Sequence, residues 1–151
     1  MIKLLMAVCS FLIFSNAQLY CQTPEYLKEK SEKIEAGSPF TKIINRELPA
    51  DIVYEDESII AFVPLSKQAK VHLLIVPKKE IETLNEARQE DALLLGNMLL
   101  IAAKLAKENG IENSGYRISL NLNEDAGQSV FHIHMHLLGG NTLGPMVDRI
   151  D

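Results

Sequence analysis

Three histidines alternate along a short stretch near the C-terminal end of the chain. The stretch reads HIHMH from His132 to His136, and His72 is the only other histidine among the 151 residues. A neutral imidazole can act as a nucleophile or a general base near neutral pH, and it also binds transition metals. Three imidazoles at every second position are therefore candidates for a chemical site.

A β-strand is the element that would present these histidines together. Side chains at alternate positions of a strand share one face, so His132, His134 and His136 are expected to point the same way. The apolar residues between them would then point to a core face, which we expect to meet a long helix. These are Phe131, Ile133, Met135 and Leu137.

Four interpretations of the histidine strand follow from its residue types. The first is a polar strand face without function. The second is a zinc site in which a His-x-His pair gains His72 as a third ligand. The third is a nucleotide-binding site without turnover. The fourth is catalysis on a phosphate, in which one imidazole attacks phosphorus, another group orients it, and a proton donor serves the leaving group.

The turn before the histidines offers groups that could bind an anion. It reads DAGQS from Asp125 to Ser129, and Gly127 suits a tight turn. Backbone N–H groups and the Ser129 hydroxyl could take the charge on phosphate oxygens. This turn favours a phosphate site over a bare polar face. The lack of a cysteine or glutamate signature beside the histidines argues against zinc.

The rest of the sequence supplies a sheet and helices to hold this strand. Helix formers run without proline from 85 to 109 and predict one long helix. Hairpins before and after that helix predict an α+β fold. Runs of β-branched and aromatic residues predict five strands, at 52–54, 59–63, 70–77, 116–123 and 129–138.

The expected long helix is apolar on more than one side. Further leucines lie outside its main apolar stripe, at Leu93, Leu95, Leu99 and Leu100. Such a helix needs cover on more than one side. In a domain of this size a second subunit is the natural cover, so we expect a homodimer.

The first 17 residues have the features of a secretory signal peptide. Lys3 precedes an apolar run that ends in small residues at Ala17. The run is shorter than the ~20 residues that span a bilayer, although an uncleaved anchor is the alternative. We expect an exported protein, periplasmic or secreted, without stable membrane association after cleavage. Residues 18–38 would form a polar leader with a short helix from Pro24, and 39–151 the folded domain.

Composition narrows the class of ligand. The net charge of −5 argues against binding to nucleic-acid backbones, which attract basic surfaces. A small anion can still be held by backbone N–H groups.

The chain has two cysteines, and Cys9 would leave with the signal peptide. Cys21 would then have no partner for a disulfide, and the bulky Tyr20 before it argues against lipid attachment.

The histidine stretch resembles the signature of the histidine triad (HIT) family, His-φ-His-φ-His-φ-φ with φ apolar. The chain resembles the Hint branch in particular, from Phe40 to Met146. This resemblance implies a five-stranded antiparallel sheet with one long and one short helix, and sheets joined across a homodimer. It also implies hydrolysis of a purine nucleoside 5′-monophosphate that carries an amine-type leaving group, without a metal or another cofactor.

The resemblance implies a role for each matching residue. His134 is the nucleophile that forms a nucleotidyl-histidine, and His136 contacts the phosphate and serves the leaving group. His72 hydrogen-bonds and orients the nucleophile, while His132 is structural. Ser129 is both catalytic and nucleotide-binding. The other nucleotide-binding positions are Leu65, Asn121, Gly127 and Gln128.

The chain departs from the family in two places. The Hint branch usually has an Asp before an apolar residue just after the second strand, and this Asp holds the ribose hydroxyls. Here the pair is Pro64-Leu65, and proline cannot replace a bidentate carboxylate. We therefore expect weaker nucleoside binding, and a non-enzymatic nucleotide-binding protein is the alternative function. Some HIT proteins bind zinc through Cys-x-x-Cys near the first strand. The chain has SPFTKI there, so we expect no zinc.

Overall fold

A computed structural model describes residues 22–145. The predicted signal peptide, Cys21 and Met146 lie outside these residues. The described strands are β1 (Asp51–Glu55), β2 (Ile59–Val63), β3 (Val71–Pro77), β4 (Tyr116–Ser119) and β5 (Met135–Gly139). The helices are α1 (Pro24–Glu35), α2 (Pro39–Ile44) and α3 (Ala92–Glu108), with short 3₁₀ helices η1 (Leu84–Glu86) and η2 (Gln89–Asp91).

The five strands form one antiparallel sheet in the order β1-β2-β3-β5-β4. This arrangement confirms the predicted α+β class and the five-stranded antiparallel sheet. The central pair, β3 and β5, places Leu74 opposite His136 and His72 opposite Leu138. His72 and His136 are therefore diagonal neighbours on one face of the sheet, close enough for long side chains to touch.

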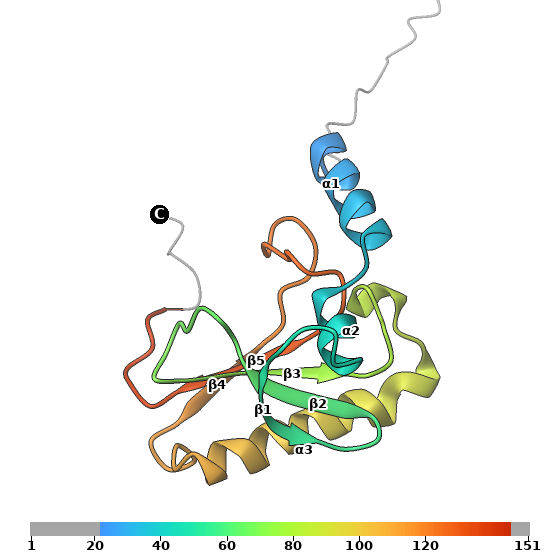
Figure 1. Ribbon diagram of the computed structural model, residues 1–151. Helices are drawn as coiled ribbons and strands as arrows, with labels where there is room; N and C mark the ends of the chain where they lie inside the picture. The colour runs from blue at the N-terminus through green and yellow to red at the C-terminus, as the bar shows by residue number, and fades with distance from the viewer. Residues whose placement is uncertain (1–21, 146–151) are drawn as a thin grey trace, which may run out of the picture.

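Helices cover both faces of the sheet (Figure 1). On one face, Met98 and Leu105 of α3 pack in a buried cluster with Met135 and Leu137 of β5. This confirms that the apolar side of β5 meets the long helix. On the other face, Phe40 of α2 packs with residues of β2 and β3. Because His72 shares a strand face with Leu74 and Val76, which pack with Phe40, His72 also points toward the α2 side of the sheet.

The predicted histidine strand is wrong in its length. It was expected to run from 129 to 138, yet β5 begins only at Met135. Its partner β3 ends at Pro77, which has no N–H to continue the ladder. The N–H of Ile133 instead donates to the Ile81 carbonyl at 2.7 Å. Of the three alternating histidines, only His136 therefore lies on a regular strand.

The predicted fourth strand is also too long. It was expected to reach Asn123, but β4 ends at Ser119, opposite His136. Because β5 starts at Met135, the ladder has no partner beyond this point. The chain then leaves the sheet in a loop that includes Asn121 and closes with a hydrogen bond from the Gln128 N–H to the Asn123 carbonyl.

The long helix begins later than predicted. It was expected from 85, whereas α3 starts at Ala92 after two 3₁₀ turns. The Thr83 backbone N–H and hydroxyl both donate to the Glu86 carboxylate, which fixes the first turn. Buried Asp91 accepts hydrogen bonds from the Arg88 N–H and the Lys79 ammonium. These side-chain bonds compete with a continuous helix. No helix between residues 22 and 145 has the length and hydrophobicity needed to cross a membrane.

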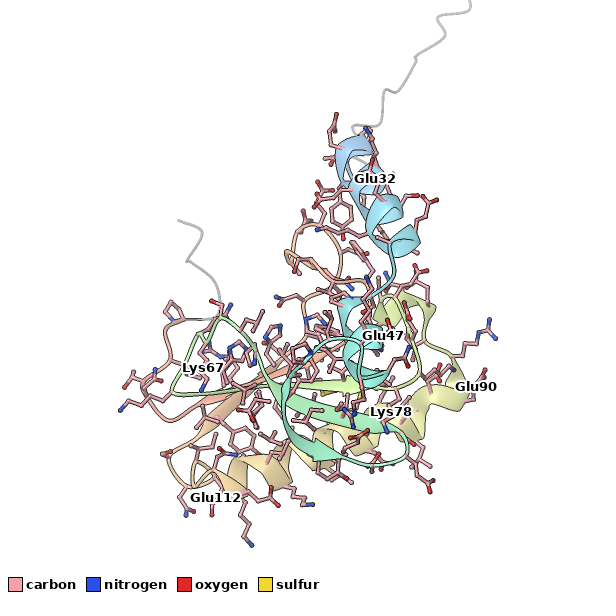
Figure 2. All side chains as sticks on the ribbon, in the orientation of Figure 1. Glu32, Glu47, Lys67, Lys78, Glu90 and Glu112 are labelled. Atoms are coloured by element: carbon pink, nitrogen blue, oxygen red, sulfur yellow. The ribbon has the colours of Figure 1, made fainter. Side chains whose placement is uncertain are left out.

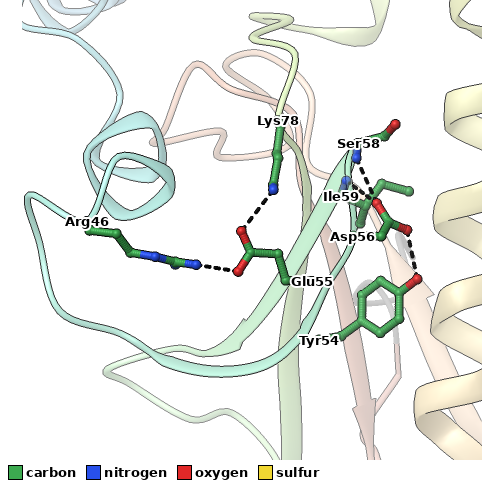
Figure 3. Close-up of polar contacts among 7 residues, drawn as sticks. All are labelled: Arg46, Tyr54, Glu55, Asp56, Ser58, Ile59 and Lys78. Atoms are coloured by element: carbon green, nitrogen blue, oxygen red, sulfur yellow. Dashed lines mark hydrogen bonds and ion pairs between the residues drawn. The ribbon is translucent and has the colours of Figure 1, made fainter.

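Polar contacts hold the β1–β2 hairpin (Figure 3). The Asp56 carboxylate accepts hydrogen bonds from the N–H groups of Ser58 and Ile59 and from the Tyr54 hydroxyl. Burial opposes its ionisation, but these bonds outweigh burial and lower the pKa of Asp56. Glu55 lies between Lys78 and Arg46, whose hydrogen bonds lower the pKa of that carboxyl.

Charged side chains are spread over the outside of the molecule (Figure 2). Glu32 of α1, Glu90 of η2 and Glu112 after α3 all project into solvent. They come from separate elements, so the acidic charge is dispersed and does not mark one binding face. Anion binding at the candidate site therefore depends on the groups within the site and not on the overall surface charge.

Candidate active site

His134 presents a ring nitrogen without a proton. Its Nδ1 lies 2.9 Å from the His132 carbonyl oxygen, and because a carbonyl only accepts, Nδ1 carries the hydrogen. In the neutral ring Nε2 then keeps its lone pair. Burial lowers the pKa of His134, against the opposing effect of the His132 carbonyl. The ring is therefore neutral near pH 7 and has the form needed for nucleophilic attack.

His132 ties this segment to the end of β3. The residue is fully buried, and its Nε2–H donates to the Pro77 carbonyl at 2.7 Å. Burial lowers its pKa. The Phe40 ring packs against His132 and, at a centroid distance of 4.9 Å, against His134. These contacts anchor the His132 ring, and its purely structural role stays a prediction.

His72 lies in a different place from the one expected. It was predicted to hydrogen-bond the nucleophile His134, but its Nε2 lies 3.0 Å from Nδ1 of His136. The diagonal register of β3 and β5 brings these two rings together. The Gln68 backbone N–H donates to Nδ1 of His72, so the His72 proton is on Nε2. His72 therefore orients His136 in this structure.

The same chain of bonds fixes the tautomer of His136. Because His72 donates to Nδ1, the neutral His136 ring carries its hydrogen on Nε2. Burial, followed by the neighbouring His134 and His72, lowers the pKa of His136 to about 4. His136 is thus a neutral hydrogen-bond donor at pH 7, and an anion brought against it would raise its pKa.

His136 borders a cavity of about 460 Å³. Asn121, a predicted nucleotide-binding residue, lines the same cavity, together with Ser119 and Arg117 of β4. No local pattern in the sequence marks Ser119 or Arg117 as a site residue. Strand alternation places both on one face, but only the pairing of Ser119 with His136 shows that this face adjoins the histidines.

Several polar groups of the turn that was predicted to bind phosphate make hydrogen bonds within the protein. Gly127 has a φ of 68°, a conformation that glycine adopts readily, and its N–H donates to the Glu124 carbonyl. The Gln128 amide accepts from the Asn123 N–H and donates to two carbonyls, including that of Glu82. Gln128 is buried and supports the loop. Ser129 remains exposed and borders a second cavity of about 240 Å³ between the loop and the junction of α1 and α2.

The departure at Pro64-Leu65 lies directly after β2, as predicted. Leu65 is fully exposed and is not among the residues that line the cavity beside His136. The same loop carries Lys67, whose charge adds to burial in lowering the pKa of His72.

The histidines of this site are not arranged as a metal centre in the described residues. Across residues 22–145, no three side chains of His, Cys, Asp or Glu lie close enough together to hold a metal ion. His72 Nε2 and His136 Nδ1 are hydrogen-bonded to each other, so these two ring nitrogens are not free to bind a metal. Metal-free chemistry stays a prediction.

Comparison with known proteins identifies the family. The model of the HIT domain matches residues 45–143. The chain belongs to the HIT family. It is 51% identical over 108 residues to the purine nucleoside phosphoramidase of Escherichia coli K12, covering 72% of this chain and 91% of that relative. The family prediction is confirmed.

Solved HIT structures share the fold. A HIT family hydrolase from Legionella pneumophila has a TM-score of 0.70 and 46% identity, covering 72% of this chain and 96% of its own. Another from Clostridium thermocellum has a TM-score of 0.70 and 44% identity, covering 74% and 96%. The matched domain lies within the predicted 39–151, and α1 lies outside it.

Proposed function

We propose that this HIT-family hydrolase cleaves the P–N bond of a purine nucleoside 5′-phosphoramidate, or a related bond, through a nucleotidyl-histidine on His134. The observation that carries the proposal is the His134 ring, whose Nδ1–H is held by the His132 carbonyl. Its Nε2 lone pair is free, and burial keeps the ring neutral. The substrate class is supported by the phosphoramidase relative.

The reaction proceeds in two displacements. His134 Nε2 attacks phosphorus, and the P–N bonding pair leaves with the amine nitrogen, which takes a proton from water. Water then attacks the nucleotidyl-histidine, releasing the nucleoside monophosphate and restoring neutral His134. His136 Nε2–H and the Ser129 hydroxyl stabilise charge on the phosphate oxygens. Asn121, which lines the cavity beside His136, is a proposed contact to the nucleotide, as are Gly127 and Leu65.

The enzyme is further proposed to act as an exported homodimer. Leu93, Leu99 and Leu100 of α3 expose 75%, 49% and 71% of their surface. An apolar helix face of this kind is typical of a subunit interface. Export rests on residues 1–17, whose sequence has the charged start, apolar run and small-residue end of a signal peptide.

The test is hydrolysis of an adenosine 5′-phosphoramidate by the purified protein in chelator, beside His134→Ala. Turnover that disappears in the variant, while circular dichroism shows the fold intact, supports metal-free nucleophilic catalysis. AMP binding without turnover would favour the alternative, a nucleotide-binding protein, for which the loss of the ribose-binding carboxylate at Pro64 is the supporting feature. Activity that chelator removes and zinc restores would favour a metal-dependent hydrolase.

A further inference from the structure

Helix α1 lies against the loop that leads into the histidines. The helix precedes the matched HIT domain, which begins at residue 45. Figure 1 shows it beyond the end of the sheet, beside the loop between β4 and β5. Its contacts with that loop occur at two places, Glu124 and Phe131, that lie on either side of Ser129.

The first contact joins the start of α1 to the start of the turn. The Thr23 backbone N–H donates to one Glu124 carboxylate oxygen, and the Thr23 hydroxyl donates to the other, each at 2.6 Å. The same hydroxyl accepts a hydrogen bond from the Tyr26 N–H and so caps the helix. Bonds to an ionised carboxylate are stronger than bonds between neutral groups. Thr23 thereby couples the formation of α1 to the position of Glu124.

The second contact holds the residue just before the histidines. Phe131 is buried, with 5% of its surface exposed, and the Tyr26 ring meets it edge-on at a centroid distance of 6.0 Å. The Lys30 ammonium lies 5.4 Å from the same ring, within the range of a cation–π contact. Both partners of Phe131 come from α1.

The segment between these two contacts carries groups that the proposed reaction uses. Ser129 lies within it, and the His132 carbonyl, which holds the His134 ring, follows Phe131 directly. Two backbone amides of the loop are hydrogen-bonded within it: the Gly127 N–H donates to the Glu124 carbonyl and the Gln128 N–H to the Asn123 carbonyl. Their hydrogen exchange with solvent therefore reports on the order of the loop. Movement at either end would shift both the serine and the carbonyl.

We propose that α1 is a positioning element for the active site, with Thr23 and Tyr26 acting through Glu124 and Phe131. The inference rests on the proposed function for its kinetic consequence, because Ser129 and His134 are the groups being positioned. Its structural part, the restraint of residues 124–131 by α1, can be measured without any substrate. The helix thus extends the site beyond the HIT domain of this chain.

Hydrogen exchange of the full chain tests the restraint. In Thr23→Ala, the Gly127 and Gln128 amides are expected to exchange several-fold faster, because the hydroxyl bond to Glu124 and the cap of α1 are lost and only the backbone N–H bond to Glu124 remains. Thr23→Ser keeps the hydroxyl and is expected to exchange like the wild type. Lys28→Ala alters an exposed position on the same helix and serves as the matched control. Unchanged exchange in Thr23→Ala would overturn the proposal.

Kinetics test the effect on the site. Thr23→Ala is expected to lower kcat by about three- to tenfold with little change in KM, because misplaced groups weaken the transition state most. Thr23→Ser should restore kcat. A purely structural role would lower the melting temperature and leave kcat unchanged well below it, which would contradict the proposal. If the wild type shows no hydrolysis, the proposed function fails. The positioning role of α1 is then judged by hydrogen exchange alone, and unchanged exchange of the Gly127 and Gln128 amides in Thr23→Ala would overturn it.

Discussion

At the scale of single residues, the site depends on which ring nitrogen carries a hydrogen. Two backbone groups decide this: the His132 carbonyl fixes the ring of His134, and the Gln68 N–H fixes that of His72. The hydrogen bond from His72 Nε2 to His136 Nδ1 fixes the tautomer of His136. One imidazole is thereby left with a free lone pair and another with a free N–H, so chemically identical side chains acquire different roles.

The activity should persist into mildly acidic solution. Burial lowers the pKa of His134 below its usual 6.5 and that of His136 to about 4. Because the nucleophile must be neutral, the active fraction is lost only when pH falls through the lowered pKa of His134. We expect kcat/KM to stay level from pH 8 to 6.5 and to fall below that. A pH–rate profile measures this, and an acid limb centred at 6.5 or higher would contradict it.

At the scale of elements, α3 divides its apolar residues between two surfaces. Met98, Ala102 and Leu105 are buried against the sheet. Leu93, Leu99 and Leu100 face away from it and are exposed in the single chain. The stripe that packs on the sheet contains only some of the apolar residues of α3, so the exposed leucines need a different partner.

Leu100→Asp should prevent association of the proposed homodimer. A carboxylate at this position would lose its hydration in an apolar interface, and burying an unpaired charge is costly. Sedimentation at micromolar concentration is expected to show a dimer for the wild type and a monomer for the variant. Leu27→Asp, an exposed leucine of α1, is the matched control and should stay dimeric. A monomeric wild type would remove the dimer from the proposed function.

At the scale of the whole molecule, the histidines link the site to stability. All four lie in or beside the core, and burial is the first cause of the lowered pKa in each of them: His72, His132, His134 and His136. The folded chain therefore holds these rings neutral where the unfolded chain would protonate them. The same burial serves the nucleophile and weakens the fold in acid.

The free energy of unfolding should fall as pH drops below 6.5. A group with a lowered folded pKa binds its proton in the unfolded chain first, so stability is complete above the unfolded pKa and declines between it and the folded pKa. Each fully responding histidine contributes at most about 1.4 kcal/mol per pH unit. Urea unfolding at pH 8, 6.5 and 5 measures this. A midpoint that does not change between pH 6.5 and 5 would contradict the assignment of neutral buried rings.

The sequence by itself determined the periodic and local features of this protein. Alternation along β3 placed His72 on one face and Leu73 on the other, and Pro77 marked the end of that strand. The histidine stretch predicted the HIT family. Such features follow from neighbours a few positions apart, since the strand and helix periods are properties of the backbone.

Only the tertiary structure decided which groups meet. His72 bonds His136 because of the β3–β5 register between residues 64 positions apart. The Gln128 amide is occupied by the Glu82 carbonyl, 46 positions away. Strand alternation fixes the face of a side chain, but its partner on that face depends on register and on where each ladder ends. Those are set by packing among segments distant in sequence, so no local pattern encodes them.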